Sequence, residues 1–213
     1  MTTNKMLSRI ENGVGYITFN NPEKHNAVSI EMWDALERIL DDFRSDNTVR
    51  VIVLNGAGGK SFVSGADISK FDKERSSKEA ILSYNKRTQK VYENLESFPK
   101  PTIAMINGYC IGGGLNLAVC CDIRICSEKS KFAMPAAKLS LGYPFSSIKR
   151  LFDVMFANAF CKNPPVLVSN SFTTAGIFLF CSSFCIFNEP SALSVPSPNF
   201  NLARFCSLIK NMI

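Results

Sequence analysis

The sequence is poor in the residues that most often build metal sites and disulfide frameworks. It contains one histidine, and its eight cysteines form no pair of CxxC motifs, although Cys120 and Cys121 are adjacent. Paired CxxC motifs are the common signature of a structural zinc site, and unpaired thiols are typical of proteins kept in a reducing compartment. The composition therefore predicts no metal site and a cytoplasmic chain with free cysteines.

No N-terminal targeting signal is expected from the sequence. The first ten residues, MTTNKMLSRI, have no apolar core of the kind a signal peptide needs, and they are too poor in arginine to predict a transit peptide. The net charge of +6 is compatible with anionic small molecules or phosphate backbones and is diagnostic of neither. With 213 residues, 46% of them apolar, the chain is long enough for one large domain or two small ones.

Three consecutive glycines, Gly112, Gly113 and Gly114, form the most informative stretch. They follow an apolar run and precede residues with helical apolar spacing. Because glycine has no Cβ, its backbone N–H can approach a ligand closely, and the N–H groups at a helix N-terminus are unpaired and attract negative charge. The stretch predicts an anion or oxyanion site. A tight strand-to-helix turn without a ligand is the alternative.

The rest of the pattern predicts alternating strands and helices. Residues 10–19 indicate a hairpin, and Ser29 is a candidate cap for the helix that follows. A surface helix is expected over residues 73–98, ended by Pro99 and Pro101. The predicted strands cover residues 49–54, 102–106, 122–127 and 131–133.

A strand, a glycine-rich turn and a helix thus occur twice, over residues 49–68 and 102–121. In mostly parallel α/β structures, ligands bind at the carboxyl ends of the strands. Each turn offers backbone donors at such an end. Two donors, one from each turn, are therefore expected to converge on one atom.

Four motifs follow one another over roughly the first 160 residues: NPEKHNAVS, FVSGADI, NGYCIGGGLNLAVCCDIRI and FAMPAAKLSLGY. Together they resemble the crotonase, or enoyl-CoA hydratase/isomerase, superfamily. The resemblance implies an α/β fold, a crotonase-like (ClpP/crotonase) spiral of repeated ββα units, assembled as homotrimers or hexamers. Residues 1–160 are the expected acyl-CoA-binding core, and residues 161–213 are a divergent segment in place of the usual helical region.

The resemblance further implies that the chain binds an acyl-coenzyme A thioester, with coenzyme A as part of the substrate and no separate cofactor. In the family, two backbone N–H groups bind the thioester oxygen, and these map to Ala66 and Gly113. Lys24 is a candidate phosphate contact, with a solvated loop lysine as the alternative. The other expected contacts to coenzyme A are Asn26, Ala27, Asp67, Ile68 and Gly112.

The chain departs from the family pattern at two catalytic positions. Hydratases of the family position water and move protons with two glutamates, and this chain has Asn116 and Ala136 there. Each acid or base group typically contributes 10² to 10⁴-fold. Efficient hydration is therefore not expected, although a lyase or isomerase of this family remains the class that the resemblance implies.

Tyr143 suggests a different reaction. Its context, LSLGY, is similar to that of the methylmalonyl-CoA decarboxylases of the superfamily, which implies decarboxylation of an acyl-CoA as an alternative activity. Decarboxylation needs a stabilised enolate but no strong base to begin. A packing aromatic at a pocket rim is the other interpretation of Tyr143.

A non-catalytic binding protein is the rival from another class. One member of the superfamily binds AU-rich RNA through a lysine-rich helix, and a comparable basic segment occurs here, diluted by glutamates. Basic helix faces are usually only solvated, so acyl-CoA is favoured over nucleic acid as the ligand. The basic residues are Lys73, Arg75, Lys78, Lys86, Arg87 and Lys90.

The C-terminal quarter has an unusual composition. From Leu151 onward the chain holds ten of its 17 phenylalanines and only two acids, Asp153 and Glu189. Residues 166–187 are long enough to span a membrane, but their many serine, threonine and asparagine residues argue against insertion. A shifted reading frame or a decayed terminus explains the composition better, and no membrane partner is expected.

Overall fold

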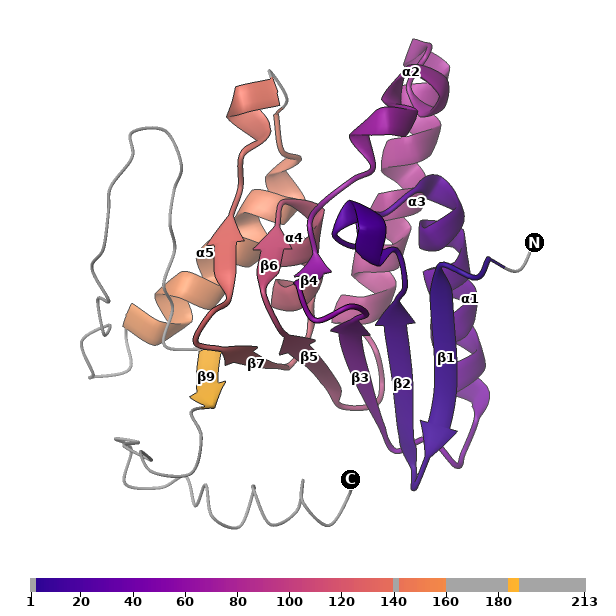
Figure 1. The fold of residues 1–213 in the computed structure, drawn as a ribbon, viewed down its shortest axis with the longest axis vertical. Coiled ribbons are helices and arrows are strands. Elements are labelled where there is room, and N and C mark those ends of the chain that lie inside the picture. The colour runs from indigo at the N-terminus through magenta and orange to yellow at the C-terminus, as the bar shows by residue number, and fades with distance from the viewer. Residues whose placement is uncertain (1–2, 140–141, 160–183, 188–213) are drawn as a thin grey trace.

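The computed structural model describes residues 3–139, 142–159 and 184–187. In this part of the chain, pairs of strands are each followed by a helix (Figure 1). The strands and helices are β1 Met6–Glu11, β2 Val14–Phe19, α1 Ile30–Ser45, β3 Val51–Gly56, β4 Ser61–Val63, α2 Phe71–Glu74, α3 Lys78–Glu96, β5 Thr102–Ile106, β6 Tyr109–Ile111, α4 Gly113–Cys120, β7 Ile123–Ser127, β8 Lys131–Ala133, α5 Phe145–Ala159 and β9 Phe184–Phe187. Three short 3-10 helices are η1 Pro22–Lys24, η2 Ile68–Lys70 and η3 Ala136–Leu139.

The strands form two sheets. The larger sheet has the order β1-β2-β3-β5-β7-β9, and only β1 and β2 are antiparallel. The smaller sheet has the order β4-β6-β8 and is parallel throughout. From the second unit onward, the first strand of each ββα unit joins the larger sheet and the second strand joins the smaller one. This arrangement confirms the predicted α/β spiral of ββα units.

The core lies between the larger sheet and helices α1 and α3, which pack side by side (Figure 1). In α1, Met32, Trp33, Leu36 and Leu40 recur at helical spacing and are buried. In β3, the β-branched run that predicted a buried strand is covered by neighbours on both edges, because β2 and β5 pair with it in parallel. Burial of these apolar faces fixes the strand ends that carry the loops described below.

Two local predictions need correction. Ser29 occupies the position before α1, but its hydroxyl makes no capping bond; Glu74 instead accepts a hydrogen bond from the Ile30 N–H at 3.2 Å. The helix predicted over residues 73–98 is divided into α2 and α3. Ser77 causes the second start, since its side chain accepts a hydrogen bond from the Ala80 N–H at 3.1 Å.

The described part of the C-terminal quarter contributes to the larger sheet. Strand β9 pairs in parallel with β7. A piece of the predicted divergent segment, residues 161–213, therefore belongs to the same sheet as the core, and the remainder of that segment lies outside the described residues. Among the helices that are described, none has the length and apolar character needed to cross a membrane.

Candidate functional site

The backbone around Ala66 is fixed by a short parallel bridge to Val28. The Val28 N–H donates to the Gly65 carbonyl at 2.8 Å, and the Asp67 N–H donates to the Val28 carbonyl at 3.0 Å. In a parallel bridge, the residue between these two partners directs its own N–H and C=O to the opposite side. Within the described ranges, the Ala66 N–H makes no hydrogen bond to the protein.

The second glycine turn opens helix α4. Gly112 precedes the helix with a φ of 56°, a conformation that favours glycine, and its carbonyl accepts the Asn116 N–H at 3.1 Å. The Gly112 N–H is already used, since it donates to the Ala133 carbonyl at 2.8 Å. Gly113 is the first helical residue, so its N–H has no partner within the helix.

The two turns lie against each other. A Cβ placed on Gly113 would be 3.9 Å from the Cα of Gly65, and one placed on Gly112 would be at the same distance. Gly65 immediately precedes Ala66 and has a φ of 105°. The uncommitted N–H groups of Ala66 and Gly113 therefore come from adjoining backbone segments. That the two N–H groups converge on one atom stays a prediction.

The three glycines have different roles in this turn. A Cβ on Gly114 would lie 2.2 Å from the Val63 carbonyl oxygen, so only glycine lets α4 pack against β4 there. Gly112 is required by its backbone conformation. Gly113 has neither constraint, because its Cβ would meet the Tyr92 hydroxyl at 3.2 Å, Trp33 at 3.8 Å and the Cα of Gly65 at 3.9 Å, and the nearest of these atoms belongs to a side chain.

An aromatic pair supports Gly113 from behind. The rings of Trp33 in α1 and Tyr92 in α3 meet edge to face with centroids 5.2 Å apart. The Tyr92 hydroxyl donates to the Gly113 carbonyl at 3.3 Å. Burial raises the pKa of Tyr92 far above its ordinary value, so this phenol stays neutral and keeps its proton as a donor.

The positions of the two missing glutamates are both buried. Asn116 is 2% exposed, and its Nδ2 donates to Ser147 Oγ of α5 at 3.1 Å. Ala136, in η3, is also buried. An amide and a methyl group cannot exchange a proton with a substrate near neutral pH. Neither Asn116 nor Ala136 can therefore act as an acid or a base.

Tyr143 lies at the edge of the same turn. Its hydroxyl would be 3.1 Å from a Cβ on Gly112. The side chain is half-buried, and burial raises its pKa above the ordinary value. A neutral phenol that can donate a proton thus stands beside the turn that carries Gly113.

The loop predicted to line the coenzyme A groove is held by its own side chains. Asn26 is fully buried; its Oδ1 accepts the Asn21 N–H at 2.9 Å, and its Nδ2 donates to the carbonyls of Ala57 and Ser61 at 3.0 and 2.8 Å. The Ala27 carbonyl accepts from Asn21 Nδ2 at 2.9 Å. The Asn26 side chain therefore holds the loop in place from beneath.

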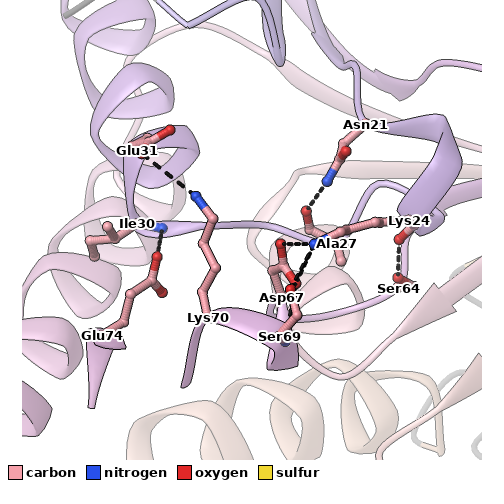
Figure 2. A network of polar contacts seen from close by, with 10 residues as sticks. All are labelled: Asn21, Lys24, Ala27, Ile30, Glu31, Ser64, Asp67, Ser69, Lys70 and Glu74. Carbon is pink, nitrogen blue, oxygen red and sulfur yellow. Dashed lines mark hydrogen bonds and ion pairs between the residues drawn. The ribbon is translucent and has the colours of Figure 1, made fainter. Parts of the chain in front are cut away.

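The remaining predicted contacts to coenzyme A, Lys24, Asp67 and Ile68, lie near Ser69. Lys24 and Asp67 form an ion pair with an Nζ to Oδ2 distance of 3.0 Å, and Ser69 joins them (Figure 2). Ile68, between Asp67 and Ser69, is exposed. A cavity of about 430 Å³ opens next to this loop, between the first turn of α1 and helix α3; its lining includes Ile30, Ser69, Lys70, Lys73, Tyr84 and Arg87.

The basic segment proposed as an RNA surface is partly occupied by contacts within the chain. Arg87 pairs with Asp34 of α1 at 2.9 Å, and Lys90 pairs with Glu37. The Arg75 guanidinium lies over the ring of Tyr84, 4.3 Å from its centroid. These contacts tie α3 to α1 and to the C-terminal end of α2. No three histidine, cysteine, aspartate or glutamate side chains form a metal site in the part of the chain that is described.

Several site residues were not found from the sequence. Gly65, which lets the two turns touch, lies inside a motif that was noted for Ala66 and Asp67. Trp33 and Tyr92 carry ordinary core signals, since they fall on the apolar faces of their helices. Nothing in the sequence around Ser147 marked it as the partner of Asn116, because the two positions meet only through the packing of α5 on α4.

Comparisons with known proteins agree on one family. A profile described as Enoyl-CoA hydratase/isomerase matches residues 9–152. The short-chain-enoyl-CoA hydratase of Clostridium acetobutylicum is 35% identical over 151 residues, which are 71% of this chain and 57% of that protein. The (E)-benzylidenesuccinyl-CoA hydratase of Thauera aromatica is 38% identical over 131 residues, 62% of this chain and 50% of that protein. The chain thus spans about half the length of the curated relatives it matches.

Solved structures give the same result for the fold. An enoyl-CoA hydratase/carnithine racemase from Magnetospirillum magneticum superimposes with a TM-score of 0.75 at 26% identity, covering 99% of this chain and 75% of that one. The enoyl-CoA hydratase from Bacillus anthracis gives a TM-score of 0.67 at 27% identity, covering 71% of this chain and 58% of that one.

Proposed function

Because this chain belongs to the enoyl-CoA hydratase/isomerase family, we propose that it binds an acyl-coenzyme A thioester and holds the thioester oxygen between the N–H groups of Ala66 and Gly113. The observation that carries this proposal is the contact between the two turns through Gly65, with both N–H groups left uncommitted by the described chain. Reactions beside a thioester carbonyl pass through an enolate-like state. Each fixed donor can lower the barrier by roughly 3–4 kcal/mol.

Two segments would contact the coenzyme A portion of the substrate. Residues 66–68 would contact the adenine and pantetheine portions, and the loop with Asn26 and Ala27 would line the same groove. The exposed apolar side chain of Ile68 supports this placement, because it offers a contact surface beside the Ala66 amide. The cavity between α1 and α3 adjoins Ser69 and is large enough to take part of a substrate.

Efficient hydration is not part of the proposal. Asn116 and Ala136 offer no group that could take a proton from water or give one to carbon. The loss of two acid/base groups predicts hydration of crotonyl-CoA at least about a thousandfold slower than in an enzyme with both glutamates. Asn116 can still hydrogen-bond a water molecule or a substrate oxygen.

The location of Tyr143 favours decarboxylation of a malonyl-type thioester as a second candidate. In that reaction the bond between the α-carbon and the carboxylate breaks, its electron pair enters the thioester as an enolate, and carbon dioxide leaves. A proton must then reach the α-carbon. The Tyr143 hydroxyl, neutral and next to Gly112, is a candidate donor for that proton, with resupply from solvent.

Assembly and location complete the proposal. A homotrimer or hexamer, a cytoplasmic location and the absence of a separate cofactor are expected by family resemblance. Among the described residues, the thiols of Cys110, Cys120 and Cys121 are buried and outside any disulfide, which suits a reducing compartment. Burial raises the pKa of Cys120 to about 12, so this thiol stays protonated and unreactive.

Side-by-side assays with crotonyl-CoA and methylmalonyl-CoA test the reaction. We expect negligible hydration by the natural chain and a rise in hydration for the double variant Asn116→Glu, Ala136→Glu. Release of carbon dioxide from methylmalonyl-CoA, reduced in Tyr143→Phe, would support the second candidate. Fast hydration of crotonyl-CoA by the unaltered chain would contradict the role assigned to the two substitutions.

A further inference from the structure

The ammonium group of Lys24 is committed to the chain's own atoms. Its Nζ lies 3.2 and 3.0 Å from Oδ1 and Oδ2 of Asp67 and 2.6 Å from Oγ of Ser69 (Figure 2). A lysine ammonium has three donors, and these three contacts can use all of them. A phosphate would therefore have to displace existing partners to bind Lys24.

The carboxylate of Asp67 is buried and strongly hydrogen-bonded. Its side chain is 3% exposed, and its Oδ1 also accepts from the N–H and Oγ of Ser69 at 3.2 and 2.6 Å. Burial opposes ionisation, yet the hydrogen bonds from Ser69 and Lys24 hold the pKa of Asp67 below its ordinary value. A buried carboxylate that loses its cation is costly, so Lys24 and Asp67 depend on each other.

Contacts on both sides of Ala66 along the chain join its loop to the loop of Lys24 and Val28. The Asp67 backbone belongs to the bridge with Val28 that orients Ala66. A second set of bonds joins the same two loops, since the Ser64 N–H donates to the His25 carbonyl at 3.1 Å and Ser64 Oγ donates to the Lys24 carbonyl at 3.3 Å. The side-chain contacts close the end of the junction beyond Ala66.

We propose that Lys24, Asp67 and Ser69 form a clamp that sets the position of the Ala66 N–H, which makes Lys24 a positioning residue in place of a phosphate contact. The inference rests on the proposed function, because the placement of that amide matters only if it binds a thioester oxygen. A misplacement of about 1 Å in a catalytic group can cost about a hundredfold in rate. The bridge to Val28 involves a single residue pair. The clamp adds the ion pair of Lys24 with Asp67, the residue that directly follows Ala66.

The clamp and the phosphate contact make opposite predictions for a substrate without phosphates. If Lys24 binds a phosphate of coenzyme A, its loss weakens binding of coenzyme A thioesters and leaves pantetheine thioesters unaffected. If Lys24 acts through Asp67, both kinds of thioester are affected alike. The loss of Asp67 should then reproduce the loss of Lys24.

A chromophoric thioester measures the amide's position without turnover. The 4-dimethylaminocinnamoyl thioesters of coenzyme A and of pantetheine absorb at longer wavelength when their carbonyl oxygen is polarised by hydrogen bonds. We expect the natural chain to shift both probes. Lys24→Met and Asp67→Asn should each lose at least half of the shift with both probes, and the double variant should lose no more than the larger single loss, because the two residues act as one unit.

Matched variants separate the clamp from general damage. Ser69→Ala removes the hydroxyl that accepts from Lys24 and donates to Asp67 but leaves the ion pair, so it should give a smaller loss of shift in a folded protein. Lys90→Met removes a lysine that pairs with Glu37 between α3 and α1, and should leave the shift unchanged. Thermal unfolding of each variant checks that the fold is retained, and Ser69→Ala keeps the test decisive if the larger changes unfold the chain.

Each outcome has a distinct meaning. Absence of binding and of any shift with the natural chain would overturn the proposed function itself. A shift by the natural chain that persists undiminished in Asp67→Asn and Ser69→Ala would overturn the clamp and leave the function standing. Weakened binding of only the coenzyme A probe in Lys24→Met would show a phosphate contact and would also overturn the clamp.

Discussion

At the scale of single residues, the proposed chemistry rests on two backbone N–H groups. Ala66 is held by its neighbours, since Gly65 and Asp67 both bond to Val28 and leave the Ala66 amide directed away from Val28. Gly113 owes its uncommitted N–H to its place as the first residue of α4. Neither donor depends on a side chain. A substitution by proline, which removes a backbone N–H, therefore tests the site more directly than shortening a side chain does.

Gly113→Pro removes one of the two donors with little other change. Proline is tolerated at the first position of a helix, where its missing N–H would have no helical partner. We expect the rate of turnover to fall about 10²–10³-fold. The shift of the chromophoric probe described above should also decrease. Gly113→Ala is the control, because it keeps the N–H and adds only a Cβ near the Tyr92 hydroxyl. Equal behaviour of the two variants would remove Gly113 from the site.

The clamp carboxylate gives a prediction about acid stability. The pKa of Asp67 is lower in the folded chain than its ordinary value of about 3.9. Its stabilisation is therefore present above pH ~4 and is lost as the pH falls through the folded pKa. Asp67→Asn should lower the free energy of unfolding by about 1–3 kcal/mol near neutral pH, and the difference should shrink in acid.

Urea unfolding at a series of pH values measures this difference. Asp72→Asn, which alters an exposed carboxylate of the neighbouring helix α2, is the control and should change stability by less than about 0.5 kcal/mol. A stability loss in Asp67→Asn that stays constant down to pH 3 would show that the charge of Asp67 does not stabilise the fold.

At the scale of elements, the α1–α3 pair supports the site from behind. Trp33 and Tyr92 project from these helices to the back of Gly113, and their edge-to-face contact depends on how the helices pack. The salt bridges of Arg87 and Lys90 to α1 lie along the same junction. Exposed ion pairs add little stability, so apolar burial must set the spacing of the two helices.

Two leucines of α3 test this division between buried and exposed faces. Leu95 is 1% exposed, whereas Leu82 is 68% exposed. We expect Leu95→Ala to lower the free energy of unfolding by about 2–5 kcal/mol, because it leaves a cavity in the core. The same change at Leu82 should stay within about 0.5 kcal/mol. Denaturant unfolding measures both, and equal losses would contradict the packing of α3.

The elements show what sequence periodicity can and cannot predict. Most of the strands and helices up to β8 were predicted with shifts at the ends, because buried faces follow periods of two and about 3.6 residues. The short strands β4 and β6 were not predicted, since they fall in stretches interpreted as glycine-rich turns. The break between α2 and α3 was missed, since a single capping serine, Ser77, divides an otherwise helical run. The exposure of Leu82 was also not foreseen, because apolar spacing alone does not tell which face of a surface helix is covered.

The site shows a second limit of prediction. Its backbone donors could be proposed from the sequence, because glycine turns after strands are a local signal and the motif order strengthened it. The side-chain partners were not located: Lys24 meets Asp67 across 43 residues, and Asn116 meets Ser147 across 31. Contacts of that range depend on how the ββα units stack, which no local pattern encodes. The sequence analysis consequently gave Lys24 as a candidate phosphate contact or a solvated lysine, and its partners within the chain were not predicted.

At the scale of the whole molecule, the stacking of ββα units brings the two glycine turns together. Parallel pairing of β4 with β6 places the ends of these strands side by side, so the turns that follow them adjoin. The fold that brings the turns together is shared with solved enoyl-CoA hydratase structures, and Asn116 and Ala136 stand at the two positions where the sequence analysis expects glutamates. Binding of an acyl-coenzyme A thioester is therefore the central claim, ahead of any particular reaction.

Calorimetric titration of the full chain with acetyl-CoA tests that claim most directly. We predict saturable heat with a dissociation constant in the micromolar range, a binding free energy of about −8 kcal/mol at 1 μM, and competition by free coenzyme A. Gly113→Ala should bind acetyl-CoA with similar affinity, because it keeps the backbone N–H of residue 113. No heat with acetyl-CoA, together with no competition by coenzyme A, would contradict the account.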